Sequence, residues 1–124
     1  MSRISHKTDN NPIKQKSFHF AVRIIKFAKW LRLEHKEFEL ASQILRSGTS
    51  IGANVSEAQY AQSRKDFLSK LNIALKEAYE TEYWLQLFLE ADIITRDSYN
   101  SLQRDLTEIL KLLIKITKTT KTAN

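Results

Sequence analysis

The stretch that decides the fold is residues 63–89, SRKDFLSKLNIALKEAYETEYWLQLFL. Its apolar residues recur three, four or seven positions apart, a spacing that lines one face of an α-helix. The inward face is predicted to carry Phe67, Leu71, Ala74, Ala78, Leu85 and Leu89. Ser63 and Asp66 fit a capping box, which satisfies free backbone amides at a helix start. We therefore expect a helix over about residues 64–90.

Three further stretches show the same periodicity, over about residues 12–33, 37–60 and 96–118. Asn11 precedes Pro12, and an asparagine cap followed by proline is a common helix start. Thr95 is the expected cap of the last helix. The inward faces of these three helices are predicted to carry Ile13, Phe20, Ile24, Phe27, Leu31, Ala41, Ile44, Gly48, Ile51, Val55, Leu102, Leu106, Ile109, Leu113 and Ile116.

The chain has 124 residues, which is room for one domain with a substantial core. It holds two glycines and one proline, whereas folds with many turns draw heavily on both residue types. Because links of a few residues force neighbouring helices to run antiparallel, we predict an all-α, up-down-up-down four-helix bundle over residues 12–118. Residues 1–11 are expected to form a flexible basic arm, and residues 119–124 a flexible tail.

Positive charge is concentrated at the two ends of the sequence. The net charge is +6, and residues 1–36 hold nine Lys or Arg against two acids. Cations share one exposed face of the last helix and one side of the first. Such stripes attract phosphates without selecting a base sequence, although the same charge can serve solubility alone. The candidate nucleic-acid-binding residues are Arg104, Lys111, Lys115, Lys118, Lys16, Arg23 and Lys26. The first helix begins where the last one ends, so a shared basic pole is expected from Arg3, Lys7, Lys14, Lys16, Lys115, Lys118 and Lys121.

Residues outside the core faces favour a subunit interface. The third helix has a second line, spaced four and three apart, made of Ile73, Glu77, Glu80, Trp84 and Leu87. The first helix has Phe18, Val22, Ile25 and Leu33 away from its core. A lone bundle covers one stripe per helix, so these residues predict contact with another subunit; the alternative is scattered surface apolar residues.

The second helix combines two glycines with a polar line. Gly48 and Gly52 are interpreted as a site of close helix packing, because their flanks are too polar for a membrane motif. The polar line is either a solvated face or a contact surface, and it consists of Gln43, Arg46, Ser50, Asn54 and Glu57. We expect Arg46 to pair with Glu57 or with a glutamate of the third helix, since its guanidinium has five donors to satisfy.

The sequence offers no recognisable catalytic or metal site. It has no cysteine, and neither H-E-x-x-H nor the Glu-x-x-His of di-iron bundles occurs. Glu82 is predicted to fall within the core stripe, as a general acid of raised pKa or, more commonly at such positions, as a paired structural residue. We therefore expect no enzyme activity, no cofactor and no metal.

The sequence also predicts a cytoplasmic protein. No apolar run approaches the roughly 20 residues that cross a bilayer. The polar residues 1–11 do not fit a secretory signal.

Two motifs carry a family resemblance. Residues 43–58, QILRSGTSIGANVSEA, resemble the Q-I-x-R-x-x-x-S-I-x-x-N-x-x-E-G pattern of a bacterial four-helix-bundle family, the 23S rRNA intervening-sequence (S23-like) proteins. Residues 76–85, KEAYETEYWL, resemble that family's K-E-A-x-E-T-x-Y-W-L. The likeness covers about residues 18–116, and Ala58 replaces the usual glycine, which predicts a longer second helix. Recurring family positions, interpreted as structural or interface residues, are matched by Arg46, Ser50, Asn54, Glu57, Glu80 and Glu82.

The resemblance implies a ring-like homo-oligomer, typically a pentamer. It also implies kinship with the accessory variability protein of diversity-generating retroelements, a basic pentameric barrel that engages a reverse transcriptase and nucleic acid. Two hypotheses follow. The first is a non-enzymatic adaptor that binds RNA, DNA or a reverse transcriptase. The alternative is a structural protein–protein interaction module with no nucleic-acid role. Neither involves a membrane.

Overall fold

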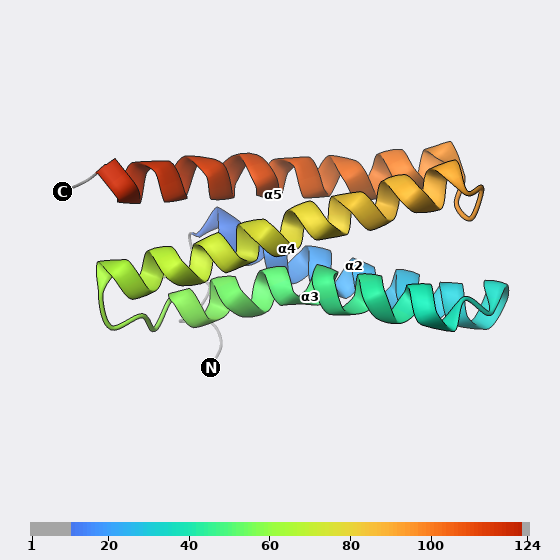
Figure 1. Ribbon diagram of the computed structural model, residues 1–124, viewed down its shortest axis with the longest axis horizontal. Coiled ribbons are helices and arrows are strands. Elements are labelled where there is room, and N and C mark those ends of the chain that lie inside the picture. The colour runs from blue at the N-terminus through green and yellow to red at the C-terminus, as the bar shows by residue number, and fades with distance from the viewer. Residues whose placement is uncertain (1–10, 123–124) are drawn as a thin grey trace.

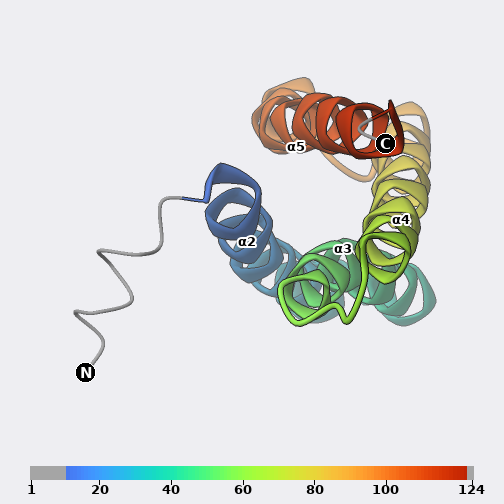
Figure 2. The same cartoon turned by 90° about the vertical axis from the view of Figure 1, so that its left-hand side faces the viewer.

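The computed structural model describes residues 11–122, and this part of the chain forms four α-helices. They are α2 (Pro12–His35), α3 (Phe38–Ala58), α4 (Arg64–Glu90) and α5 (Arg96–Thr122). Consecutive helices run antiparallel (Figure 1), and seen end-on they follow one another in chain order around the bundle (Figure 2). α5 returns beside α2, the pair of neighbours that touches least. The predicted all-α four-helix bundle is confirmed.

The predicted helix starts are confirmed by their caps. Asn11 Oδ1 accepts a hydrogen bond from the Lys14 amide at 3.3 Å, directly before Pro12. Ser63 Oγ accepts from the Asp66 amide at 3.0 Å, and the Asp66 carboxylate accepts from the amide of Gln62 at 3.2 Å. These bonds satisfy amide groups that have no partner inside the helix.

The cap of α5 is Thr95, whose Oγ1 accepts from the Ser98 amide at 3.1 Å. The three helices whose starts are marked by a capping residue in the sequence therefore begin directly after that residue.

Three helix ends differ from the prediction, whereas α4 ends at Glu90 as expected. α2 continues to His35 and stops at Lys36, whose left-handed backbone (φ 55°) lets the following amide bond back to Leu31. α3 ends at Ala58 rather than near residue 60, so the alanine does not lengthen it; three amides after it bond to carbonyls three residues back, as in a tighter turn.

The expected tail at residues 119–124 is wrong for residues 119–122, which belong to α5. This segment has no glycine or proline to stop the helix, and Thr117 just before it is buried with its hydroxyl bonded to the Leu113 carbonyl at 2.8 Å. Residues 1–10 of the expected arm lie outside the described residues.

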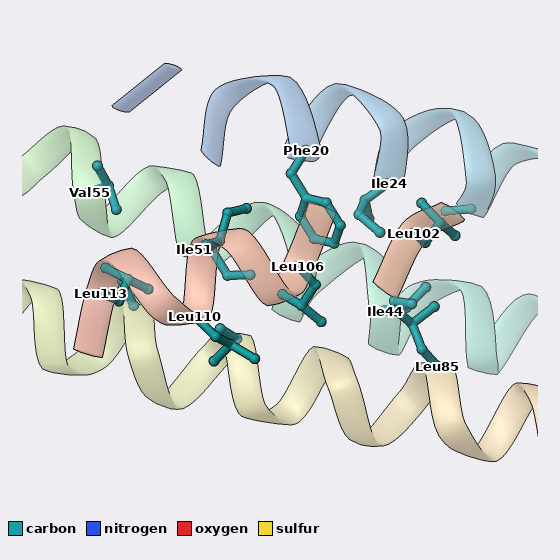
Figure 3. Close-up of a cluster of buried hydrophobic side chains, with 14 of the residues drawn as sticks. Phe20, Ile24, Ile44, Ile51, Val55, Leu85, Leu102, Leu106, Leu110 and Leu113 are labelled. Carbon is teal, nitrogen blue, oxygen red and sulfur yellow. The ribbon is translucent and has the colours of Figure 1, made fainter. Parts of the chain in front are cut away.

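One apolar core runs through the bundle, with side chains from all four helices (Figure 3). The predicted inward faces of α2, α3 and α5 are buried apart from Phe27 and Ile116, which are half-buried at the core edge. On α4 the prediction departs from the structure at two positions, and one of them is Phe67, which is half-buried at the core edge. Phe88 is buried and Leu89 only half-buried, because the periodicity continues from Thr81 through Leu85. No described helix is long and apolar enough to cross a membrane.

The two glycines of α3 lie where α2 comes close, as predicted. A Cβ atom on Gly48 would stand 2.8 Å from Ile24 Cγ2, and one on Gly52 would stand 3.1 Å from the Ser17 carbonyl oxygen. Missing side chains therefore set the distance between these two helices.

Candidate functional site

The basic stripe of α5 is the strongest candidate surface. Arg104, Lys111, Lys115 and Lys118 are all exposed, and their spacing places them on one side of α5. Arg104, Lys111 and Lys115 form no ion pair with any described residue, so their charges face solvent. Unpaired cations on one exposed face can neutralise the phosphates of a nucleic-acid backbone.

The candidate cations of α2 are mostly engaged within the fold. Lys16 Nζ lies 3.0 Å from Glu108 Oε1, and Arg23 Nη1 lies 2.7 Å from Asp105 Oδ2. The guanidinium of Arg23 also donates to the carbonyl and hydroxyl oxygens of Ser101, at 3.2 and 2.8 Å. These bonds hold α2 against α5 where apolar contact is thin. Of this group, only Lys26 remains exposed without an ion pair to a described residue.

The expected basic pole is formed in part. The start of α2 and the end of α5 lie toward the same end of the bundle (Figure 1), and α4 also begins there. A shallow pocket at this end is lined by Arg64, Lys65, Leu68, Thr120 and Lys121, so α4 adds two cations that the prediction left out. Arg3 and Lys7 lie outside the described residues.

The polar line of α3 is a contact surface toward α4, not a plain solvated face. Arg46 Nη1 donates to Glu77 Oε1 at 3.2 Å, and Nη2 donates to Glu80. Glu80 accepts a further hydrogen bond from the indole of Trp84 at 3.1 Å. The hydrogen bond from Arg46 is the main cause that holds the pKa of the Glu80 carboxyl below its ordinary value, and the hydrogen bond from Trp84 is the second. The predicted carboxylate partner of Arg46 is confirmed.

The rest of this line bonds partly to α4 and partly within α3. Glu57 pairs with Lys70 of α4 at 3.0 Å. Ser50 donates to the Arg46 carbonyl at 2.7 Å, and Asn54 donates to the Ser50 carbonyl at 2.9 Å. Deeper in, the hydroxyls of Ser47 and Thr81 are hydrogen-bonded at 2.9 Å and both residues are buried. Of the matched family positions on α3, Arg46 and Glu57 thus link α3 to α4, whereas Ser50 and Asn54 bond within α3.

Glu82 lies at the seam between α4 and α5, not within the core stripe as predicted. It is half-buried, and its carboxylate accepts a hydrogen bond from Gln103 Nε2 at 2.8 Å. Since the glutamine is its partner, Glu82 is a paired structural residue, one of the two interpretations that the sequence left open. Within the described part of the chain, no three His, Cys, Asp or Glu side chains gather as metal ligands.

Of the residues of α4 that were predicted for a subunit interface, two are exposed apolar side chains and three contact other residues of the fold. Ile73 and Leu87 each keep 40% of their surface exposed. Glu77 and Glu80 are held by Arg46, and Trp84 packs against Phe88 with ring centroids 6.3 Å apart. On α2, the largest exposed apolar side chains of the predicted set are Phe18, Leu33 and Ile25, whereas Val22 is half-buried.

A groove of about 530 Å³ lies beside Phe18, with Ala21 on its α2 side and Gly52 and Ala53 on its α3 side. The sequence predicted the apolar side chains of this region but not the groove, which exists because small residues face each other across the two helices.

A further line on α4 was missed. Lys65, Ser69, Asn72, Lys76, Tyr79 and Tyr83 follow the outer face of this helix at spacings of four and three, and all six are exposed. The spacing was present in the sequence. Polar residues and tyrosines are normal at a helix surface, however, so only the position of α4 beside the α5 stripe gives this line a meaning.

The geometry defines a small antiparallel four-helix bundle with an apolar core, and its candidate sites consist of exposed cations and exposed apolar side chains on the outer faces. The chain belongs to the family of 23S rRNA-intervening sequence proteins, whose sequence pattern matches residues 9–115. Among solved structures, it is similar to a protein of unknown function from the S23 ribosomal protein family of Bacteroides thetaiotaomicron VPI-5482. The two chains are 61% identical with a TM-score of 0.86, over 88% of this chain and 97% of that one. No curated protein matches. The family resemblance predicted from the two motifs is confirmed.

Proposed function

We propose that this protein is a non-enzymatic, homo-oligomeric nucleic-acid-binding protein that holds phosphate backbones on α5. The observation that carries the proposal is the α5 stripe, in which Arg104, Lys111 and Lys115 are exposed with no acidic partner among the described residues. The net charge of +6 adds a long-range attraction for polyanions. The name of the family, which refers to intervening sequences of 23S rRNA, is in keeping with such a ligand.

Binding of this kind is electrostatic and reads no base sequence. Each phosphate that a cation neutralises releases condensed counterions, so affinity falls steeply as salt rises. With about 3–6 phosphates held per subunit, the logarithm of the binding constant should fall with a slope of about that size against the logarithm of salt concentration. A ring of subunits would present several stripes and steepen this slope.

The test is filter binding of duplex DNA and RNA at low salt, with a triple reversal of Lys111, Lys115 and Lys118 to glutamate. We expect binding to be abolished while helicity and mass stay unchanged. A matched charge change on α2, Lys26→Glu with Lys29→Glu, is compared with the α5 double variant Lys111→Glu with Lys115→Glu. If the α2 pair weakens binding as much as the α5 pair, the assignment to α5 is wrong. A wild-type protein that binds neither duplex contradicts the proposal.

The oligomer in this proposal is supported by apolar side chains that the described chain leaves exposed. Ile73 and Leu87 project beside the α3–α4 seam, and Phe18 stands by the groove on another face. Two different apolar faces on one subunit suit a head-to-tail contact, which closes into a ring when the rotation allows. The pentamer implied by the family resemblance is one such ring.

Leu87→Glu tests the oligomer, because Leu87 is exposed enough to be replaced without opening the core. Light scattering after size-exclusion chromatography should show a mass of several chains for the wild type and a smaller mass for the variant. Gln86→Glu is the matched control, with the same new charge on a neighbouring exposed residue. A wild-type monomer at tens of micromolar would contradict this part of the proposal.

The same apolar surfaces favour the second candidate, a protein–protein interaction module. The reverse transcriptase expected from the resemblance stays a prediction within either candidate. Loss of oligomeric mass in Leu87→Glu together with no nucleic-acid binding by the wild type would favour the interaction module.

A further inference from the structure

We propose that the face shared by α4 and α5 binds single-stranded nucleic acid, with Tyr79 and Tyr83 stacking on unpaired bases. This inference rests on the proposed function, in which the α5 stripe holds phosphates. It adds a strand preference that the stripe alone does not supply.

The two tyrosines are unusually open for aromatic residues of a helix. Tyr79 and Tyr83 keep 50% and 56% of their surface exposed, one turn apart on the outer face of α4. Neither phenol forms a hydrogen bond with a described residue, and among the described aromatic rings Tyr83 meets that of Trp84, edge-on with centroids 5.5 Å apart. Their ring faces are therefore available to a ligand with π-faces of its own.

The register of α4 and α5 places Tyr79 on the side of α4 that adjoins α5. Glu82 and Gln103 are hydrogen-bonded across the seam, and Tyr79 lies one helical turn before Glu82. The antiparallel helices stay together to their far end, where Lys65 and Lys121 line one pocket. An extended strand that follows the outer side of this helix pair would therefore meet the tyrosines near one end and, along both helices, the exposed cations Lys65, Lys76, Arg104, Lys111, Lys118 and Lys121.

Exposed acidic groups on these sides of the two helices stand beyond the tyrosines, with Glu90 two helical turns after Tyr83 and Asp97 two turns before Arg104. On the α5 side of α4, Glu82 is the carboxylate closest in sequence to the tyrosines. It accepts a hydrogen bond from Gln103. Glu80 lies on the other side of α4, in the bond network of Arg46 and Trp84. The face thus combines the two elements of general single-strand binding sites, cations along the backbone and aromatic rings for the bases.

The spacing favours a single strand over a duplex. Four residues of helix separate the two tyrosines by about 6 Å along the axis. Stacked bases of a duplex strand are about 3.4 Å apart and cover each other's faces. Only an unpaired, extended strand can offer two successive bases at the wider interval, so a duplex should use the cations without the tyrosines.

The experiment compares an oligo(dT), an oligo(rU) and a duplex of equal length, by fluorescence anisotropy with the full chain at low salt. The key variant is Tyr79→Leu with Tyr83→Leu, which keeps apolar bulk and helix propensity but removes the rings. We expect it to weaken single-strand binding by about tenfold or more and to leave duplex binding unchanged, because stacking contributes only to unpaired bases. Tyr60→Leu is the control, since Tyr60 is exposed but lies in the α3–α4 connection. Comparison of the two oligonucleotides shows whether DNA or RNA is preferred.

The outcomes separate the two proposals. Single-strand binding that survives in the double variant overturns the stacking role while the phosphate-binding proposal stands. A double variant that loses oligomeric mass overturns it too, because the tyrosines would then be subunit contacts. If the wild type binds no oligonucleotide, both proposals fail. The α5 reversal should weaken single-strand and duplex binding alike, unlike the tyrosine variant.

Discussion

α3 meets its two neighbours in opposite ways. Toward α2 it presents Gly48 and Gly52, and the helices approach until a Cβ atom on Gly48 would clash with Ile24. Toward α4 it presents Ser47, Arg46 and Glu57, which are linked across the seam by hydrogen bonds and ion pairs. One seam is set by the absence of side chains and the other by paired side chains. Substitutions should therefore act through overpacking on the α2 side and through lost partners on the α4 side.

The largest effect on stability is expected from Gly48→Val. The new side chain must displace Ile24, which is buried on all sides, so unfolding should become easier by about 1–3 kcal/mol. Intrinsic helix propensity would act in the opposite direction, since glycine is a poor helix former. Urea denaturation followed by circular dichroism measures the change. Ala53→Val, an exposed site on the same helix, is the control, and equal stability of the two variants would show that the α2–α3 approach is not close.

A smaller effect is expected from Thr81→Val on the polar seam. This change leaves the buried Ser47 hydroxyl without its partner, at a cost of about 1–2 kcal/mol. Removing both hydroxyls, in Ser47→Ala with Thr81→Val, should restore part of that loss because no polar group is then left unpaired. Denaturant midpoints of Thr81→Val, Ser47→Ala and the double variant give the coupling energy between the two hydroxyls. A double variant whose loss equals the sum of the single losses would show that the two hydroxyls do not act as a pair.

The smallest effect is expected from Arg46→Gln. Half of the Arg46 side chain is exposed, so solvent screens the pairs and the loss should stay below about 1 kcal/mol, decreasing with salt. The lowered pKa of Glu80 fixes the pH window of this contribution. The stabilisation is fully present above the ordinary glutamate value near 4.5 and is lost as the pH falls through the lower folded-state pKa. Stability curves of wild type and variant should therefore converge in acid, and a constant gap down to pH 2 would contradict the assignment.

Local features of this fold were predictable because their signals are local. Asn11, Ser63 and Thr95 cap helices at the predicted positions, since a cap depends on a few neighbouring residues. Helix ends were less predictable. Lys36 ends α2 in a backbone conformation where glycine is usual, and nothing in the sequence around it marks the stop. The end of α5 was placed too early because a threonine- and lysine-rich segment resembles a tail when its buried Thr117 cannot be seen.

The candidate surfaces show the same division. The spacing of Arg104, Lys111 and Lys115 predicted one exposed basic face, which the structure has. The spacing of Lys16 and Arg23 predicted a similar face on α2, yet these cations lie against Glu108 and Asp105 of α5. Helical periodicity gives the direction of a side chain on its own helix but carries no information about which charges on another helix it will meet.

The sequence by itself determined that four helices form, that they alternate in direction, and which face of each turns inward, because periodicity, caps and short links are properties of neighbouring residues. It also determined the family, through the two motifs of α3 and α4. Only the tertiary structure decided which cations are paired and which are open, that Glu82 meets Gln103, and that Tyr79 and Tyr83 stay exposed. Those relations depend on the register between helices far apart in the chain, which packing of the whole core fixes.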